Sequence, residues 1–237
     1  MLKHIPNFFT LSNLFCGCLA TVLLFDEIVN VNLVALIVLI GIVFDFLDGF
    51  FARKFNLQSR LGLELDSLAD LITSGLVPGI IIFNLFKTSN DLNISIISDE
   101  WFAYFAFLIT IASAYRLAKF NIQENSKNYF LGLPVPANTI IILSLLLILE
   151  TSDSEFIKNL ITNDIVLIVI VFVSSFLMNS NYKFISFKFY NYNFNKLNNL
   201  RYLLLASSVI LFIIIGYVSI PLLFLIYFLT SYFAFRN

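Results

Sequence analysis

The chain is strongly apolar and poor in charge. It has 237 residues, of which 59% are hydrophobic and only 12% are charged, and its mean hydropathy is +0.92. A soluble domain carries about 25% charged residues, so the composition excludes an ordinary soluble protein and indicates an integral membrane protein. The net charge of −1 gives no reason to expect a nucleic-acid partner.

Long apolar segments recur along the whole chain. A helix that crosses the hydrocarbon core needs about 20 mainly apolar residues. Gly216 and Pro221 separate the last two segments of this kind. We therefore predict an all-α integral membrane fold with about eight transmembrane helices. Their expected ranges are 8–25, 31–51, 64–86, 101–120, 134–150, 164–179, 201–216 and 219–235.

The basic residues are unevenly distributed over the predicted connections. With the N-terminus in the cytoplasm, only Lys87 and Lys158 of the 14 Lys and Arg residues fall on the outer side. An excess of Lys and Arg marks cytoplasmic connections. We therefore predict a multi-pass protein of the inner (cytoplasmic) cell membrane with both termini in the cytoplasm. This orientation places residues 45–70 at the cytoplasmic face.

Two pairs of carboxylates lie at the cytoplasmic ends of the second and third predicted spans. Asp45 and Asp48 are three residues apart and Asp66 and Asp70 are four apart, so each pair occupies one face of its helix. A charged residue at the centre of a spanning helix costs about 2.5–3.5 kcal/mol on insertion scales, so clustered acids need a positive partner. Four oxygen ligands suit a hard divalent cation, Mg²⁺ or Mn²⁺, or a pair of them.

Small and basic residues between the two pairs suit a diphosphate group. Gly49 and Ala52 allow a ligand to approach closely, and Arg53 offers a planar fork to phosphate. We expect Gly62 to loosen the turn before the third span. The alternative is that the acids only complement helix dipoles, which could explain Asp66 alone.

The complete pattern resembles the signature of the CDP-alcohol phosphatidyltransferase family. It is Asp45-x2-Asp48-Gly49-x2-Ala52-Arg53-x8-Gly62-x3-Asp66-x3-Asp70. The resemblance implies that the first three Asp residues hold the divalent metal, expected as two ions. It also implies that Asp70 is the general base and a further metal ligand. The small residues and Arg53 would contact the cytidine diphosphate.

The same resemblance implies an architecture. Family members have a six-helix core around the site and form homodimers. We therefore divide the chain into this core (1–180), a cytoplasmic interfacial loop (181–200) and two additional transmembrane helices (201–237). Because the loop is polar, aromatic and basic, we expect it to lie on the lipid headgroups. A role facing the substrate is the alternative.

Three further segments resemble the bacterial membrane-integral phosphatidylserine synthases of this family. They are IPNFFTLSNLFCG (5–17), YRLAKFN (115–121) and GLPVPAN (132–138). The chain departs from the usual pattern at Tyr115, Lys119, Val135 and Asn138. The resemblance favours serine as the acceptor alcohol, with glycerol 3-phosphate or inositol phosphate as alternatives.

Three residues in these segments are candidates for contacts with the substrates. Arg116 is either a partner for the serine carboxylate or only part of the cytoplasmic bias of basic residues. Asn121 either hydrogen-bonds the substrate or caps its helix. Asn13 is a buried amide that contacts either the nucleotide or the Asp cluster.

The sequence thus predicts a phosphotransferase. It would transfer the phosphatidyl group from CDP-diacylglycerol to L-serine by metal-assisted direct displacement with Asp70 as base, giving phosphatidylserine and CMP. A cation transporter is the alternative from another class. It should carry its acids near the bilayer midplane on broken helices in matching halves. Here the acids lie at one face, and no internal repeat is evident.

Overall fold

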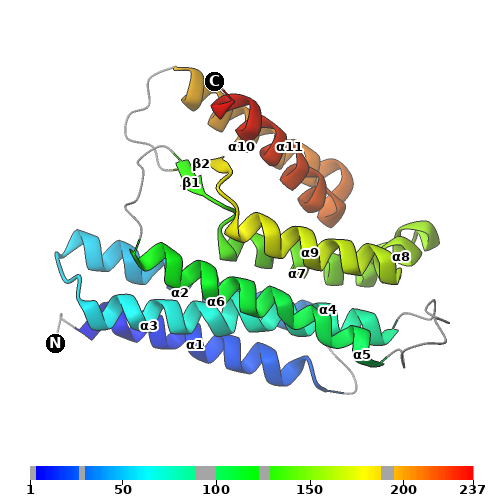
Figure 1. Cartoon of the computed structure of the whole chain (residues 1–237), viewed down its shortest axis with the longest axis horizontal. Coiled ribbons are helices and arrows are strands. Elements are labelled where there is room, and N and C mark those ends of the chain that lie inside the picture. Colours follow the sequence, from blue (N-terminus) through cyan, green and yellow to red (C-terminus); the bar gives the residue numbers. More distant parts are fainter. Residues whose placement is uncertain (1–3, 27–29, 89–99, 123–128, 188–194, 237) are drawn as a thin grey trace.

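The computed structural model describes residues 4–26, 30–88, 100–122, 129–187 and 195–236, most of which are helical. The helices are α1 (Ile5–Leu23), α2 (Val31–Lys54), α3 (Arg60–Asp70), the π-helix η2 (Leu71–Leu76), α4 (Val77–Thr88), α5 (Glu100–Ala103), η3 (Tyr104–Phe107), α6 (Leu108–Ile122), α7 (Val135–Thr151), α8 (Glu155–Thr162), α9 (Asp164–Asn179), α10 (Lys196–Ile215), η4 (Gly216–Val218) and α11 (Ser219–Phe235). Within the described ranges, β1 (Tyr129–Leu131) and β2 (Lys183–Ile185) form the one sheet. Figure 1 shows a bundle of helices with the α10–α11 hairpin beyond the strands.

All eight predicted spans are helical, which confirms the all-α membrane fold. Among the described residues, five helical runs are long and apolar enough to cross a membrane: Ile5–Leu23, Val31–Lys54, Arg60–Thr88, Trp101–Ile122 and Leu197–Phe235. The pair α8 and α9 makes a sixth if it is counted as one span bent by 60°. The last run contains two predicted spans, α10 and α11, while α7 has only 17 residues. The count of eight crossings stays a prediction.

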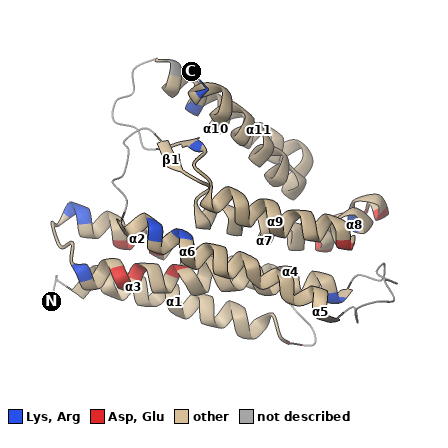
Figure 2. Ribbon diagram, viewed as in Figure 1, with Lys and Arg blue, Asp and Glu red and all other residues tan. Residues whose placement is uncertain are grey.

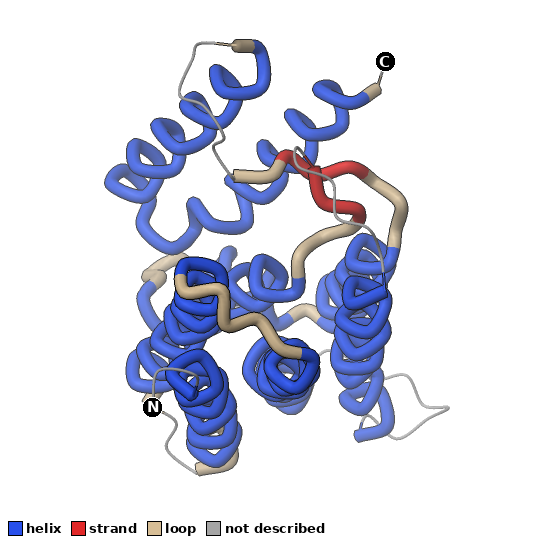
Figure 3. The backbone as a smooth tube through the Cα atoms, turned by 90° about the vertical axis from the view of Figure 1, so that its left-hand side faces the viewer, coloured by secondary structure: helices blue, strands red, loops and turns tan. Residues whose placement is uncertain are grey.

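The run from α3 through η2 to α4 lies at the centre of the bundle. It is the most deeply buried of the five apolar runs. Val77, Ile81 and Ile82 of α4 are fully buried in one hydrophobic core with Ile109 of α6 and Ile142 of α7. Figure 3 looks along the bundle and places the strand pair between it and the C-terminal hairpin. The C-terminal end of α3 is therefore anchored in the best-packed part of the molecule.

The connection between α2 and α3 is tighter than the sequence predicted. The third span was expected to begin at residue 64, but α3 begins at Arg60 because the Ser59 hydroxyl caps it, accepting a hydrogen bond from the Gly62 N–H at 3.0 Å. Asn56 turns the chain with a φ of 53°, in the left-handed region that Asn tolerates. The expectation that Gly62 loosens this turn is wrong, since it lies in the first turn of the helix. Asp66 consequently stands on a capped helix.

Part of the segment expected as a surface loop is built into the fold. Residues 183–185 form β2, which pairs antiparallel with β1 and places Phe184 opposite Phe130. Phe184 and Ile185 are 1% and 0% exposed. The Ile185 N–H donates to the Ser231 hydroxyl at 3.2 Å, and its carbonyl accepts from the Tyr227 hydroxyl at 2.9 Å. Side chains of α11 thus satisfy the backbone of this strand. Residues 188–194 of the expected loop lie outside the described residues, and the division at 180 and 200 stays a prediction.

Charged residues are segregated along the bundle. Figure 2 shows Lys and Arg where α2 ends and α3 begins, at the end of α6 and around the strands and the C-terminus. Acidic residues gather at the opposite end, around α8. The acids of the α2–α3 motif are the exception, because they lie at the basic end. This segregation agrees with the predicted orientation.

Helix α1 approaches the π-helix very closely. A Cβ added at Gly17 would lie 2.9 Å from both the Cα and the backbone nitrogen of Thr73, well inside normal contact distance. One turn earlier, the Thr73 hydroxyl donates to the Asn13 carbonyl at 2.9 Å. Glycine is therefore required at position 17 for the two elements to pack at this distance.

We expect Gly17→Ala to lower the midpoint of thermal unfolding in detergent, because the Thr73 backbone must move to accept the methyl group. Overpacking of this kind costs about 1–3 kcal/mol. Cys18→Ala is the matched control, since the neighbouring Cys18 is exposed and should tolerate the change. Equal midpoints for the two variants would contradict the close packing.

Candidate active site

The helical pair α2–α3 brings the four carboxylates of the motif together. Asp45 and Asp48 stand on the last turns of α2, and Asp66 and Asp70 on α3. One oxygen each of Asp45, Asp48 and Asp66 lies within 4.8 Å of the other two. Asp48 is only 5% exposed and Asp70 only 7%. The predicted convergence of the two carboxylate pairs is present in the structure.

These carboxylates fit a divalent cation. Three carboxylates at such distances repel one another unless a positive charge lies between them. The Asp66 Oδ1 atom is buried and has no hydrogen-bond partner among the described residues, so it is available as a ligand. Hard cations such as Mg²⁺ and Mn²⁺ prefer oxygen ligands of this kind. The donor set thus suits the metal that the sequence predicted.

Asp70 is held differently from the other three. It lies outside the group of three close oxygens, and its Oδ1 accepts a hydrogen bond from the Asn13 Nδ2 at 3.0 Å. Asn13 is almost completely buried in α1. Of the two contacts considered for Asn13, the structure has the one to the Asp cluster. The π-helix η2 begins directly after Asp70, and π-helical turns are frequent at functional sites.

Thr10 of α1 is a site residue that the sequence analysis missed. Its hydroxyl lies 2.6 Å from Asp48 Oδ2 and 3.1 Å from the Pro6 carbonyl oxygen, and it can donate to either. A hydrogen bond to a carboxylate is stronger than one between neutral groups. The available signal was its position three residues before Asn13, which puts two polar side chains on one face of an apolar helix.

The residues predicted to bind the cytidine diphosphate follow the same face of α2. Gly49, Ala52 and Arg53 continue the stripe of Asp45 and Asp48 at helical spacing. The Arg53 side chain folds back over Gly49, where an added Cβ would lie 3.0 Å from Arg53 Nη1. Gly62 stands beside Ser59 and the side chain of Asn7 in the first turn of α3. The nucleotide contacts of these residues stay a prediction.

Arg116 and Asn121 of α6 lie in two different surroundings. Arg116 is buried, and its Nε donates to the Leu133 carbonyl at 2.8 Å and its Nη2 to the Gly132 carbonyl at 3.4 Å. It therefore fixes the connection from β1 to α7. Asn121 donates from Nδ2 to the Ser67 hydroxyl at 2.8 Å, next to Asp66 on α3. Contacts of either residue with serine stay predictions.

The amino-acid sequence matches a family model and several known proteins. The family model described as CDP-alcohol phosphatidyltransferase matches residues 3–176. A CDP-diacylglycerol–serine O-phosphatidyltransferase of Bacillus subtilis is 34% identical over 135 residues, 57% of this chain and 71% of that protein. The protein of the same name in Methanocaldococcus jannaschii is 36% identical over 138 residues, 58% of each chain. The one in Helicobacter pylori is 29% identical over 190 residues, 79% of this chain and 74% of that protein.

Thr10→Val keeps the shape of the side chain and removes its hydroxyl. Losing a hydrogen bond to a charged group costs about 1.5–3 kcal/mol, and about 1.4 kcal/mol is a factor of ten in affinity. We therefore expect the Mn²⁺ affinity of the purified protein, measured by titration calorimetry, to fall tenfold or more. Thr10→Ser retains the hydroxyl and should bind Mn²⁺ like the unaltered protein. An unchanged affinity in Thr10→Val would rule out a positioning role.

Proposed function

The chain belongs to the CDP-alcohol phosphatidyltransferase family, and we propose that it transfers the phosphatidyl group of CDP-diacylglycerol to the hydroxyl of L-serine, releasing phosphatidylserine and CMP. The observation that carries this proposal is the group of three carboxylates beside a fourth, separately held Asp70. The choice of serine is supported by the names of the three relatives, each a CDP-diacylglycerol–serine O-phosphatidyltransferase, and by the segments 115–121 and 132–138.

Metal binding is the first part of the proposed mechanism. Asp45, Asp48 and Asp66 would hold Mg²⁺ or Mn²⁺, expected as two ions, with Asp70 as a further ligand. The cations would supply neutralisation of charge on the diphosphate and on the departing CMP. Thr10 keeps Asp48 in the required orientation through its hydrogen bond.

Substrate binding uses residues on both sides of the carboxylates. Gly49, Ala52 and Gly62 leave room for the cytidine diphosphate, and Arg53 donates to its phosphate oxygens. Arg116 donates two hydrogen bonds to the backbone carbonyls of Leu133 and Gly132. Its remaining N–H groups bind the serine carboxylate. Asn121, already beside α3, hydrogen-bonds the same substrate.

Proton transfer is assigned to Asp70. Asn13 donates to its Oδ1, which leaves Oδ2 to take the proton from the serine hydroxyl. The serine oxygen forms a bond to the phosphorus that carries diacylglycerol, and the bond from that phosphorus to the CMP oxygen breaks. No covalent enzyme intermediate is needed. Asn13 thus acts in this proposal by orienting the base, which is one of the two contacts considered for it from the sequence.

The setting of this reaction completes the proposal. The protein would lie in the inner, cytoplasmic membrane of the cell with its site toward the cytoplasm. The basic residues that gather near the carboxylates, at one end of the bundle, support this orientation (Figure 2). Serine and CMP can exchange there with the aqueous phase, while the lipid substrate and product stay in the bilayer. A homodimer is proposed from the family resemblance.

An acceptor panel tests the function. Membranes containing the protein are incubated with CDP-diacylglycerol, Mn²⁺ and, separately, L-serine, glycerol 3-phosphate or inositol phosphate, and CMP release is measured. We expect CMP release only in the sample that contains L-serine. Release with glycerol 3-phosphate but not with serine would replace the acceptor and leave the family chemistry intact.

Asp70→Asn tests the base. General base catalysis contributes about 10²–10⁴-fold, so we expect the rate of CMP release at saturating serine to fall by that factor. Binding of at least one Mn²⁺ should survive, because the three close carboxylates remain. Asp45→Asn is the comparison variant and should lose metal affinity as well as activity. Full activity in a metal-loaded Asp70→Asn protein would refute the assignment.

A further inference from the structure

The C-terminal part of the chain carries an unbalanced positive charge. After Asp164 the sequence has no Asp or Glu, but it contains Lys183, Lys188, Lys196, Arg201 and Arg236. This segment lies mainly beyond residue 176, where the family match ends. In the predicted orientation these basic residues lie on the cytoplasmic side, where the leaflet offers anionic lipid headgroups that attract such segments.

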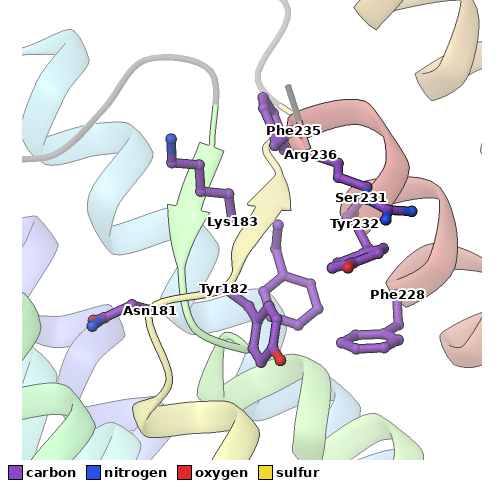
Figure 4. A pocket seen from close by; sticks show the side chains of 9 residues that line it. Asn181, Tyr182, Lys183, Phe228, Ser231, Tyr232, Phe235 and Arg236 are labelled. Carbon is purple, nitrogen blue, oxygen red and sulfur yellow. The ribbon is translucent and has the colours of Figure 1, made fainter.

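A pocket of about 200 Å³ lies in this segment, between the start of β2 and the last turns of α11 (Figure 4). It is lined by Asn181, Tyr182, Lys183, Phe184, Phe228, Ser231, Tyr232, Phe235 and Arg236. None of these nine residues is acidic, and five are aromatic. The pocket thus combines an apolar, aromatic wall with two cations.

Aromatic rings hold both cations at the sides of the pocket. The Lys183 ammonium lies 5.0 Å from the centre of the Tyr129 ring, which packs edge-on against Phe235. The Arg236 guanidinium lies 5.7 Å from the centre of the Tyr232 ring. Figure 4 shows Lys183 on the strand side and Arg236 on the helix side. A cation placed over a ring keeps its N–H groups available for an anion.

The apolar surface next to the pocket suits acyl chains. Leu225, Leu229 and Phe233 of α11 are all more than half exposed. Tyr182 and Tyr232 are ring types favoured at the boundary between headgroups and hydrocarbon. An occupant with a phosphate at one end and apolar chains at the other would match both the pocket and the adjoining helix surface.

We propose that this pocket binds one anionic phospholipid of the surrounding bilayer, with its headgroup at the mouth that Lys183 and Arg236 flank on opposite sides and its chains along α11. The site is separate from the carboxylates of α2 and α3. Neither the family match nor the proposed reaction requires it.

The pocket wall is joined to the connection that Arg116 holds. The Gly132 N–H donates to the Tyr182 carbonyl at 2.8 Å, and Arg116 donates to the carbonyls of Gly132 and Leu133. Gly132 has a φ of +72°, and an added Cβ would collide with the Met178 carbonyl, so this joint accepts only glycine. A lipid in the pocket would therefore reduce local opening of residues 129–133.

Lipid retention tests the proposal directly. The full chain is purified from nanodiscs of phosphatidylcholine with 20% phosphatidylglycerol, and the retained lipids are identified by native mass spectrometry. We expect one tightly held phosphatidylglycerol per chain. Its affinity should fall roughly tenfold to thirtyfold in the double variant Lys183→Gln, Arg236→Gln, because each basic residue near an anionic surface adds about a factor of five. The matched control is Lys87→Gln, Lys158→Gln at the other end of the bundle.

Several outcomes would overturn the proposal. The first is that the protein retains phosphatidylglycerol no better than phosphatidylcholine. The second is that the test and control variants lose lipid affinity equally. The third is that millimolar glycerol phosphate or CMP displaces the lipid. A second readout is hydrogen exchange of residues 129–133, which should slow with phosphatidylglycerol in the unaltered protein and not in the double variant. Neither measurement depends on catalysis, so the lipid site and the proposed function can fail separately.

Discussion

The crowding of carboxylates where α2 and α3 meet is the constraint on which the rest of the structure depends. At an effective dielectric constant of about 20, two unit charges 4.8 Å apart, the upper limit for these oxygens, repel by about 3.5 kcal/mol. Within a lipid-embedded bundle, water offsets less of this repulsion than it does in solution. The fold must therefore present these side chains from rigid elements, and the capped first turn of α3 and the buried run into α4 supply such support.

Helix α1 provides the polar groups that orient two of the acids. Thr10 donates to Asp48 and Asn13 to Asp70, so one helix face contacts both α2 and α3. The close approach at Gly17 and the hydrogen bond from Thr73 keep that face at the right depth. The packing of α1 against η2 and the orientation of the two acids therefore both depend on this one helix.

The second half of the chain surrounds this centre with a different kind of support. Arg116 ties the end of α6 to the connection between β1 and α7, and β2 ties that connection to α11 through Ser231 and Tyr227. The C-terminal hairpin is therefore integrated into the molecule although it lies beyond the family match. Its many exposed apolar side chains suit a lipid environment.

Features that depend on local spacing could be predicted from the sequence. The apolar spans, the bias of basic residues and the two carboxylate pairs follow from helical periodicity, because residues three and four apart share a face wherever the helix packs. The three-residue strands could not be predicted, because segments so short carry no periodic signal. The start of α3 was misplaced because the cap at Ser59 outweighed the turn tendency of Gly62.

The sequence by itself determined the two carboxylate pairs of the α2–α3 motif and the membrane-spanning, all-helical class of the fold. Only the tertiary structure decided which neighbours orient the acids and where Arg116 donates. Thr10 and Asp48 are 38 residues apart, and Asn13 and Asp70 are 57 apart. Contacts over such separations depend on the rotation and depth at which helices pack, and close contacts such as that between Gly17 and Thr73 set both.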